Sequence, residues 1–160
     1  MGTAETALIV LASVAGFPAF FSLILFVLSK IGGWNTLATR YRMDRPFQGS
    51  LWRNQFGFLG STRYNGALTV GSGMEGLYLA VFFLFRPFHP PLLIPWGEVA
   101  LGGRKQTLFG HLVEFRLGPE PLASLWLSDS LARQVASAPG AYLRGLDLHD
   151  SMAQSPDDPT

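Results

Sequence analysis

The feature that most constrains this chain is a stretch of twenty-two residues, Ala7 to Leu28, without an ionisable side chain. As a helix it would rise about 33 Å, close to the roughly 30 Å of hydrocarbon in a bilayer. A signal peptide is the weaker interpretation, because the run is longer than such signals need, no basic residue precedes it and no A-x-A pattern ends it. The sequence therefore predicts a single transmembrane anchor over residues 1–31.

Gly16 and Pro18 interrupt the middle of this anchor. Proline removes one backbone donor and crowds the preceding turn, which predicts a kink. Because lipid offers no partner for a freed carbonyl group, a kink is tolerated best where another helix packs. We therefore expect Gly16 and Pro18 to belong to a partner interface.

Positive charge follows the anchor. From Lys30 to Arg63 the chain carries six basic residues against one acidic residue, whereas Asn65 to Thr160 carries six basic and nine acidic residues. The positive-inside rule predicts a cytoplasmic C-terminal domain and an outside N-terminus in the cell (plasma or inner) membrane. Five bases are candidates for contact with anionic headgroups: Lys30, Arg40, Arg42, Arg45 and Arg53.

Residues 32–49 are predicted to form a basic juxtamembrane segment. Trp34 stands where interfacial tryptophans usually lie. A short helix is expected from Asn35 to Arg42, with Leu37 and Tyr41 on one face. That face would lie against headgroups or against the following domain.

From about Ser50 short apolar runs alternate with Gly and Pro, the pattern of a small all-β domain that we expect to reach residue 146. A helix from Ser128 or Asp129 to about Ala138 is expected to close it. Residues 147–160, rich in Asp, Ser and Pro, are predicted to be disordered. The expected strands are Leu51–Leu59, Ala67–Val70, Gly76–Phe85, Leu92–Leu101, Thr107–Leu117 and Leu122–Leu127.

The run Gly76–Phe85 is apolar on both faces of a strand and too short to span a bilayer as a helix. One alternating set would fill the barrel: Leu77, Leu79, Val81, Phe83 and Phe85. The other set, Tyr78, Ala80, Phe82 and Leu84, must be covered by the basic segment, by a partner or by lipid. Together with Gly16 and Pro18, we assign Tyr78, Phe82 and Leu84 to a predicted partner interface.

Two motifs resemble a known family. Gly76-Leu-Tyr-Leu precedes His89-Pro-Pro-Leu-Leu-Ile-Pro-Trp-Gly-Glu-Val99, and this succession resembles GRAM and bacterial pleckstrin-homology-like (PH-like) domains over roughly Ser50 to Ala138. The resemblance implies a small bent β-barrel closed at one end by a C-terminal helix. Lipid-binding members grip inositol phosphates with bases around the first hairpin, where this chain has Arg53 and Arg63.

No residue pattern indicates catalysis. Gly71 to Gly76 matches G-x-G-x-x-G, but a β-type run follows it, which favours a hairpin turn over a dinucleotide loop. His111 and Glu114 would point to opposite sides of a strand, and His89 lies in a Pro-rich loop. Zero cysteines exclude disulfides and thiolate chemistry. We expect no cofactor, metal, small-molecule substrate or nucleic-acid site.

The expected protein is one transmembrane helix followed by a small, mainly-β PH-like bent barrel closed by a helix. Its expected function is non-enzymatic: an accessory or scaffold subunit of a larger membrane complex, for example an energy-transducing one, which docks through the barrel and the kinked helix. The alternative is a PH/GRAM-like module that senses anionic lipid at the membrane surface.

Overall fold

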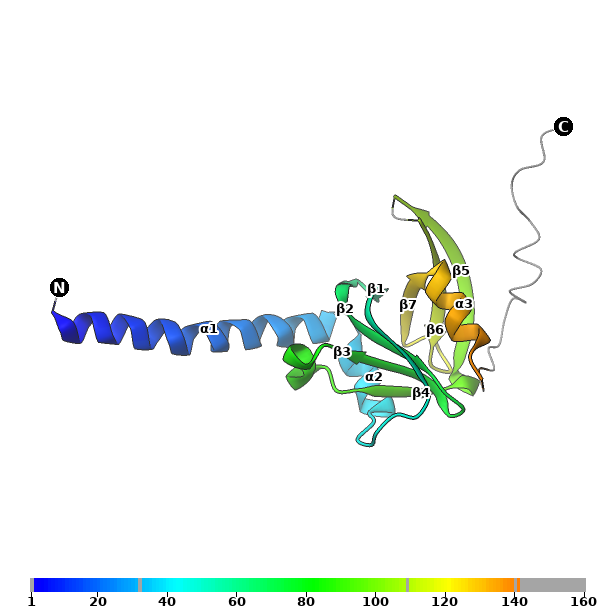
Figure 1. Cartoon of the computed structure of the whole chain (residues 1–160), viewed down its shortest axis with the longest axis horizontal. Coiled ribbons are helices and arrows are strands. Elements are labelled where there is room, and N and C mark those ends of the chain that lie inside the picture. Colours follow the sequence, from blue (N-terminus) through cyan, green and yellow to red (C-terminus); the bar gives the residue numbers. More distant parts are fainter. Residues whose placement is uncertain (1, 32, 109, 140, 142–160) are drawn as a thin grey trace.

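The N-terminal helix α1 runs from Thr3 to Ile31 and continues through Pro18 as one element. In the computed structural model, which describes residues 2–31, 33–108, 110–139 and 141, Thr3–Ile24 is long and apolar enough to cross a membrane. No part of that stretch is buried against the rest of the described protein, and α1 projects from the domain as a rod (Figure 1). By length and composition, this helix fits a membrane anchor or a signal sequence.

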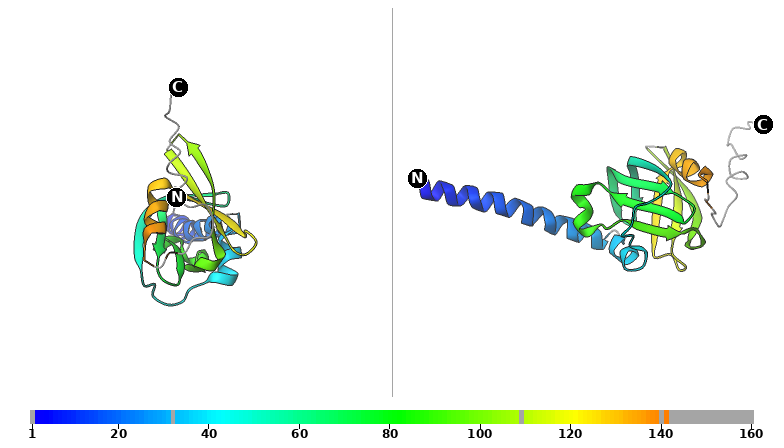
Figure 2. Two further views of the ribbon diagram at one scale, coloured as in Figure 1. Left: turned by 90° about the vertical axis from the view of Figure 1, so that its right-hand side faces the viewer. Right: turned by 60° about the horizontal axis from the view of Figure 1, so that its bottom comes forward.

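Seven antiparallel strands follow, hydrogen-bonded in the order β4-β3-β2-β1-β7-β6-β5. Strands β1 to β4 pair in chain order, and so do β5 to β7. Strand β1 joins these two groups by pairing with β7. The sheet curls into a half-barrel around its core (Figure 2). The strands are β1 Ser50–Leu59, β2 Thr62–Ser72, β3 Gly76–Val81, β4 Leu92–Pro95, β5 Val99–Thr107, β6 Gly110–Leu117 and β7 Ala123–Ser128.

The closing helix α3, Asp129–Ser137, confirms the predicted C-terminal helix. The Ser128 side chain caps it by accepting a hydrogen bond from the Leu131 amide. Its buried face is Leu131, Ala132 and Val135, which pack with the inward residues of the strands. The fold thus agrees with the expected helix, curled β-sheet and closing helix at the level of architecture.

Helix α2, Trp34–Tyr41, is part of the core. Trp34 and Leu37 are fully buried, and the Trp34 indole donates a hydrogen bond of 2.9 Å to the Pro90 carbonyl. The prediction that Trp34 lies at the membrane interface is therefore wrong. The sequence allowed the apolar face of this helix to lie against headgroups or against the following domain. In the structure this face packs against the domain.

Two predicted strands are interrupted. The strand expected over Gly76–Phe85 ends at Val81, and a 3-10 helix, η1, occupies Phe83–Phe88. The strand expected over Leu92–Leu101 is divided by a second 3-10 turn, η2, at Trp96–Glu98. Proline explains the end of β4, because Pro95 has no amide to donate to a strand partner. Strand β3 ends where the Phe82 amide donates its last hydrogen bond to the Ala67 carbonyl, before η1 begins. The turn at η2 also lets the buried Trp96 indole reach the Gly73 carbonyl, at 2.7 Å.

Candidate functional site

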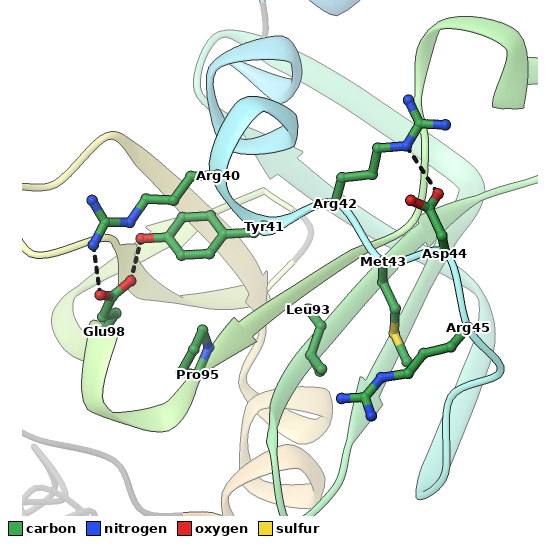
Figure 3. A pocket seen from close by; sticks show the side chains of 9 residues that line it. All are labelled: Arg40, Tyr41, Arg42, Met43, Asp44, Arg45, Leu93, Pro95 and Glu98. Carbon is green, nitrogen blue, oxygen red and sulfur yellow. Dashed lines mark hydrogen bonds and ion pairs between the residues drawn. The ribbon is translucent and has the colours of Figure 1, made fainter.

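Arginines gather around the segment that leads from α2 to β1. A surface hollow is lined there by Arg40, Tyr41, Arg42, Met43, Asp44, Arg45, Leu93, Pro95 and Glu98. Figure 3 shows Arg40 and Tyr41 both reaching Glu98, while Arg42 turns toward Asp44. The hollow contains three of the five bases that the sequence assigned to headgroup contact.

Glu98 is the electrostatic centre of this hollow. Its carboxylate accepts a hydrogen bond of 2.5 Å from the Tyr41 hydroxyl and one of 2.8 Å from Arg40. These donors stabilise the charged carboxylate, so the pKa of Glu98 lies below its ordinary value. Burial, and then the bond to Glu98, raises the pKa of Tyr41 to about 12. Arg40 and Glu98 thus form an ion pair, and the Tyr41 hydroxyl donates a further hydrogen bond to the same carboxylate.

The other two arginines of the hollow are also paired with acids. Arg42 lies 3.0 Å from Asp44, and Arg45 lies 2.6 Å from Glu75 at the turn between β2 and β3. Nearby carboxylates therefore offset the positive charge that the sequence assigned to headgroups. Lys30 lies in α1, and its side chain is outside the described part of the structure.

Arg53 has a different environment. It lines a second hollow with Arg86, Tyr78, Phe82 and Phe83. Within the described residues, neither Arg53 nor Arg86 forms an ion pair with an acid. Arg86 is not among the bases that the sequence assigned to headgroup contact, although it directly follows the apolar run Gly76–Phe85. The signal available was the spacing FFLFR, an apolar turn followed by a base.

The predicted partner interface is divided in the structure. The Tyr78 ring is stacked on Phe47 of the α2–β1 segment, and Ala80 is buried. By contrast, Phe82 and Leu84 remain about half exposed, at 46% and 50%. They lie outside β3, at η1. The chain's own α2–β1 segment thus covers Tyr78, on the strand part of this face.

The anchor part of the predicted interface is open. Gly16 and Pro18 are exposed on α1, and a Cβ built on Gly16 would meet no atom within 4 Å. The structure therefore brings Gly16 and Pro18 to one exposed helix segment and places Tyr78 elsewhere, under Phe47.

The glycine-rich motif is the turn between β2 and β3, as predicted. A Cβ at Gly71 or Gly73 would lie 2.8 or 3.1 Å from the Phe47 ring, and one at Gly76 would lie 2.1 Å from the Ile94 carbonyl oxygen. These glycines are needed for close packing.

The remaining polar candidates are separate. His111 is exposed on β6, whereas Glu114 accepts a hydrogen bond of 2.6 Å from Ser124. His89 is buried, and burial lowers its pKa. Its Nδ1 lies 3.2 Å from the Phe85 carbonyl oxygen. Among the residues that the structure describes, no three His, Asp or Glu side chains are placed to hold a metal ion.

Comparison with protein-family models, with curated protein sequences and with solved structures gave no match.

Proposed function

We propose that this protein is a non-enzymatic, membrane-anchored interaction protein that serves as an accessory or scaffold subunit of a larger membrane complex. The observation that carries the proposal is the contrast between α1 and the domain. The domain buries its own core, whereas no residue of the apolar Thr3–Ile24 stretch of α1 is buried, and Phe21 at its end touches the domain at Phe85. A bilayer supplies a cover for that surface, and a second helix can supply part of it.

We further propose a PH-like identity for the domain. Its support is the sequence resemblance, together with a curled sheet of seven strands and a C-terminal helix whose apolar face packs into the core. In the same proposal the domain is cytoplasmic and the N-terminus is outside. Protease added to intact cells should then leave residues 50–160 uncleaved, and digestion of that region from outside would overturn the orientation.

The partner contact is tested best at Gly16. Because a side chain there meets no atom of this chain, Gly16→Leu should leave the domain folded. If a partner helix packs on this face, the added side chain should release the protein from its complex. Val14→Leu is the matched control, because two residues turn the side chain by about 200° around the helix axis.

The measurement is recovery of associated subunits after extraction in mild detergent. Loss of partners in Gly16→Leu, with partners retained in Val14→Leu, supports the proposal. A protein that migrates alone in its unmodified form contradicts it.

A second candidate is an anionic-lipid-sensing module. The observation that favours it is Arg53, which lines one hollow with Arg86; neither forms an ion pair with a described acid. The ion pairs of Arg40, Arg42 and Arg45 count against a sensor built on the α2–β1 segment. In this alternative, replacing Arg40, Arg42 and Arg53 together by Gln would abolish binding of anionic vesicles.

A further inference from the structure

The 3-10 helix η1 lies beside the membrane-length helix. The rings of Phe21 in α1 and Phe85 in η1 have centroids 6.2 Å apart, and Phe21 is itself stacked on Phe17. In Figure 1 and in the right-hand view of Figure 2, η1 is drawn along the C-terminal part of α1, nearer to the N-terminus than the strands are. This turn is therefore the edge of the domain that reaches back along α1.

The contact with Phe21 fixes the level of η1 along α1. The run of residues without an ionisable side chain ends at Leu28, seven residues after Phe21. At 1.5 Å per residue, Phe21 lies about 10 Å inside that end. If α1 crosses a bilayer, the Phe85 ring beside it lies at the level of the last two apolar turns of the helix. The neighbouring residues of η1 are then within reach of the acyl chains of that leaflet.

The side chains of this turn are apolar and uncovered. Phe82, Phe83 and Leu84 expose 46%, 65% and 50% of their surface, although they adjoin a domain whose other large apolar residues are mostly buried. Consecutive exposed aromatic residues at such a place mark a contact surface. Aromatic side chains are also enriched at the level of the headgroups.

Two positively charged side chains lie next to these apolar residues. Arg86 comes two residues after Leu84, and Arg53 lines the same hollow as Phe82 and Phe83. Within the described structure no acid pairs with either guanidinium group. An apolar tip with two bases behind it matches a phospholipid leaflet, where acyl chains lie beneath a layer of phosphates.

We propose that Phe82, Phe83 and Leu84 insert into the membrane leaflet around the end of α1, and that Arg53 and Arg86 bind the phosphates of its headgroups. The proposal rests on the proposed role of α1 as a membrane anchor and adds a second point of attachment. With two attachments the domain is held in one orientation at the surface. The occupant of this apolar turn is thus lipid, and neither a partner subunit nor a second copy.

The chain has no cysteine, so single labels test this directly. Full-length protein carrying Phe83→Cys, Met74→Cys or Val14→Cys is labelled with an environment-sensitive fluorophore and reconstituted into phosphatidylcholine vesicles with phosphatidylglycerol. Lipids carrying a nitroxide quencher are then added. Met74 is the control, because it is 84% exposed in the turn before β3, at the opposite end of that strand from Phe82.

We expect quenching at position 83 to be several-fold stronger than at position 74 and comparable with that at position 14. Equal, weak quenching at positions 83 and 74, with strong quenching at position 14, overturns the inserted turn and leaves the anchor intact. A label at position 83 that is shielded from water but not quenched by lipid indicates a second copy and also overturns it. Weak quenching at position 14 overturns the anchor itself.

A double variant tests the arginines separately. In Arg53→Gln/Arg86→Gln with the label at position 83, quenching should fall, and the difference between vesicles with and without phosphatidylglycerol should disappear. Arg42→Gln/Arg45→Gln is the matched control, because both of its arginines are paired with acids and lie in the other hollow. An equal effect of both pairs would refute a specific role for Arg53 and Arg86.

Discussion

The rings of Phe47 and Tyr78 are stacked with their centroids 4.6 Å apart and their planes 19° from parallel. This contact covers part of the outer face of β3. Phe47 comes from the segment between α2 and β1, so the chain folds that segment over Tyr78. The apolar surface that is left open lies at η1, beside α1, rather than along the sheet.

Phe47→Ala should destabilise the domain by about 1–3 kcal/mol, because it removes a stacked ring pair and opens buried surface. Burial raises the pKa of Tyr78, so the variant should also lower that pKa toward its ordinary value of 10.0. Chemical denaturation and a tyrosine absorbance titration measure the two effects. Met74→Ala, in an exposed turn, should change neither; an unaltered Tyr78 pKa in Phe47→Ala would contradict the covering role.

Phe115→Ala should cost on the order of 3–5 kcal/mol, because Phe115 is among the largest fully buried side chains of the core. Leu108→Ala is the control, since Leu108 is 99% exposed at the turn after β5. Both are read from the midpoint of denaturant unfolding. A cost below 1 kcal/mol for Phe115→Ala would place this ring outside the core.

The Glu98 carboxylate should contribute acid sensitivity. Its pKa in the folded protein lies below 4.5, with the Tyr41 hydrogen bond as the largest cause. Its stabilising contribution is therefore present above pH 4.5 and is lost as the pH falls through the folded pKa. Tyr41→Phe should raise the Glu98 pKa toward 4.5, as followed by a carboxyl NMR titration. No change in that pKa would show that the hydroxyl does not stabilise the carboxylate.

His89 should add a second pH dependence, at higher pH. Burial holds its pKa below 6.5, so the unfolded chain binds this proton first as the pH falls. Stability should therefore be complete above pH 6.5 and decline as the pH falls toward the folded pKa. His89→Phe keeps a ring against Trp34 and should flatten this part of the profile. His111→Phe, at an exposed position, is the control; a matching change in both variants would rule His89 out as the source.

A fragment that begins at Gly33 should fold, and one that begins at Asp44 should not. The second lacks Trp34, Leu37 and Tyr41, which are buried in the core. Circular dichroism should show a β-dominated spectrum with a cooperative thermal transition for the longer fragment alone. Equal transitions in both would mean that α2 is dispensable for the fold.

Local pattern was sufficient for much of this architecture. Length and composition predicted the apolar helix, and the alternation of side chains along β6 places Val113, Phe115 and Leu117 on one buried face. The start of α3 was predicted at Ser128 or Asp129, because a capping side chain acts on the first turn of its own helix; Ser128 is the one that caps it. Each of these features depends on residues close together in the chain.

Contacts between distant residues could not be read in the same way. The end of β3 depends on the Phe82 amide, which makes the last bond of that edge to Ala67, after which η1 turns toward α1. Burial of Trp34 depends on the Pro90 carbonyl, and the pairing of Arg45 depends on Glu75. Arg40 and Arg45 pair with Glu98 and Glu75, which are distant in sequence, and this is why these two arginines could not be told apart from Arg53. The pair of Arg42 with Asp44 is local, two residues apart.

The junction between the two helices limits the reach of the domain. Helix α1 ends at Ile31 and α2 begins at Trp34, whose side chain is fully buried, so only two residues of sequence separate the two helices. The three Cα–Cα steps from Ile31 to Trp34 span about 11 Å at full extension. In the proposed membrane setting, a domain joined so closely to α1 cannot reach ligands far from the bilayer. Whatever it binds must come to the membrane surface, within the height of the domain itself.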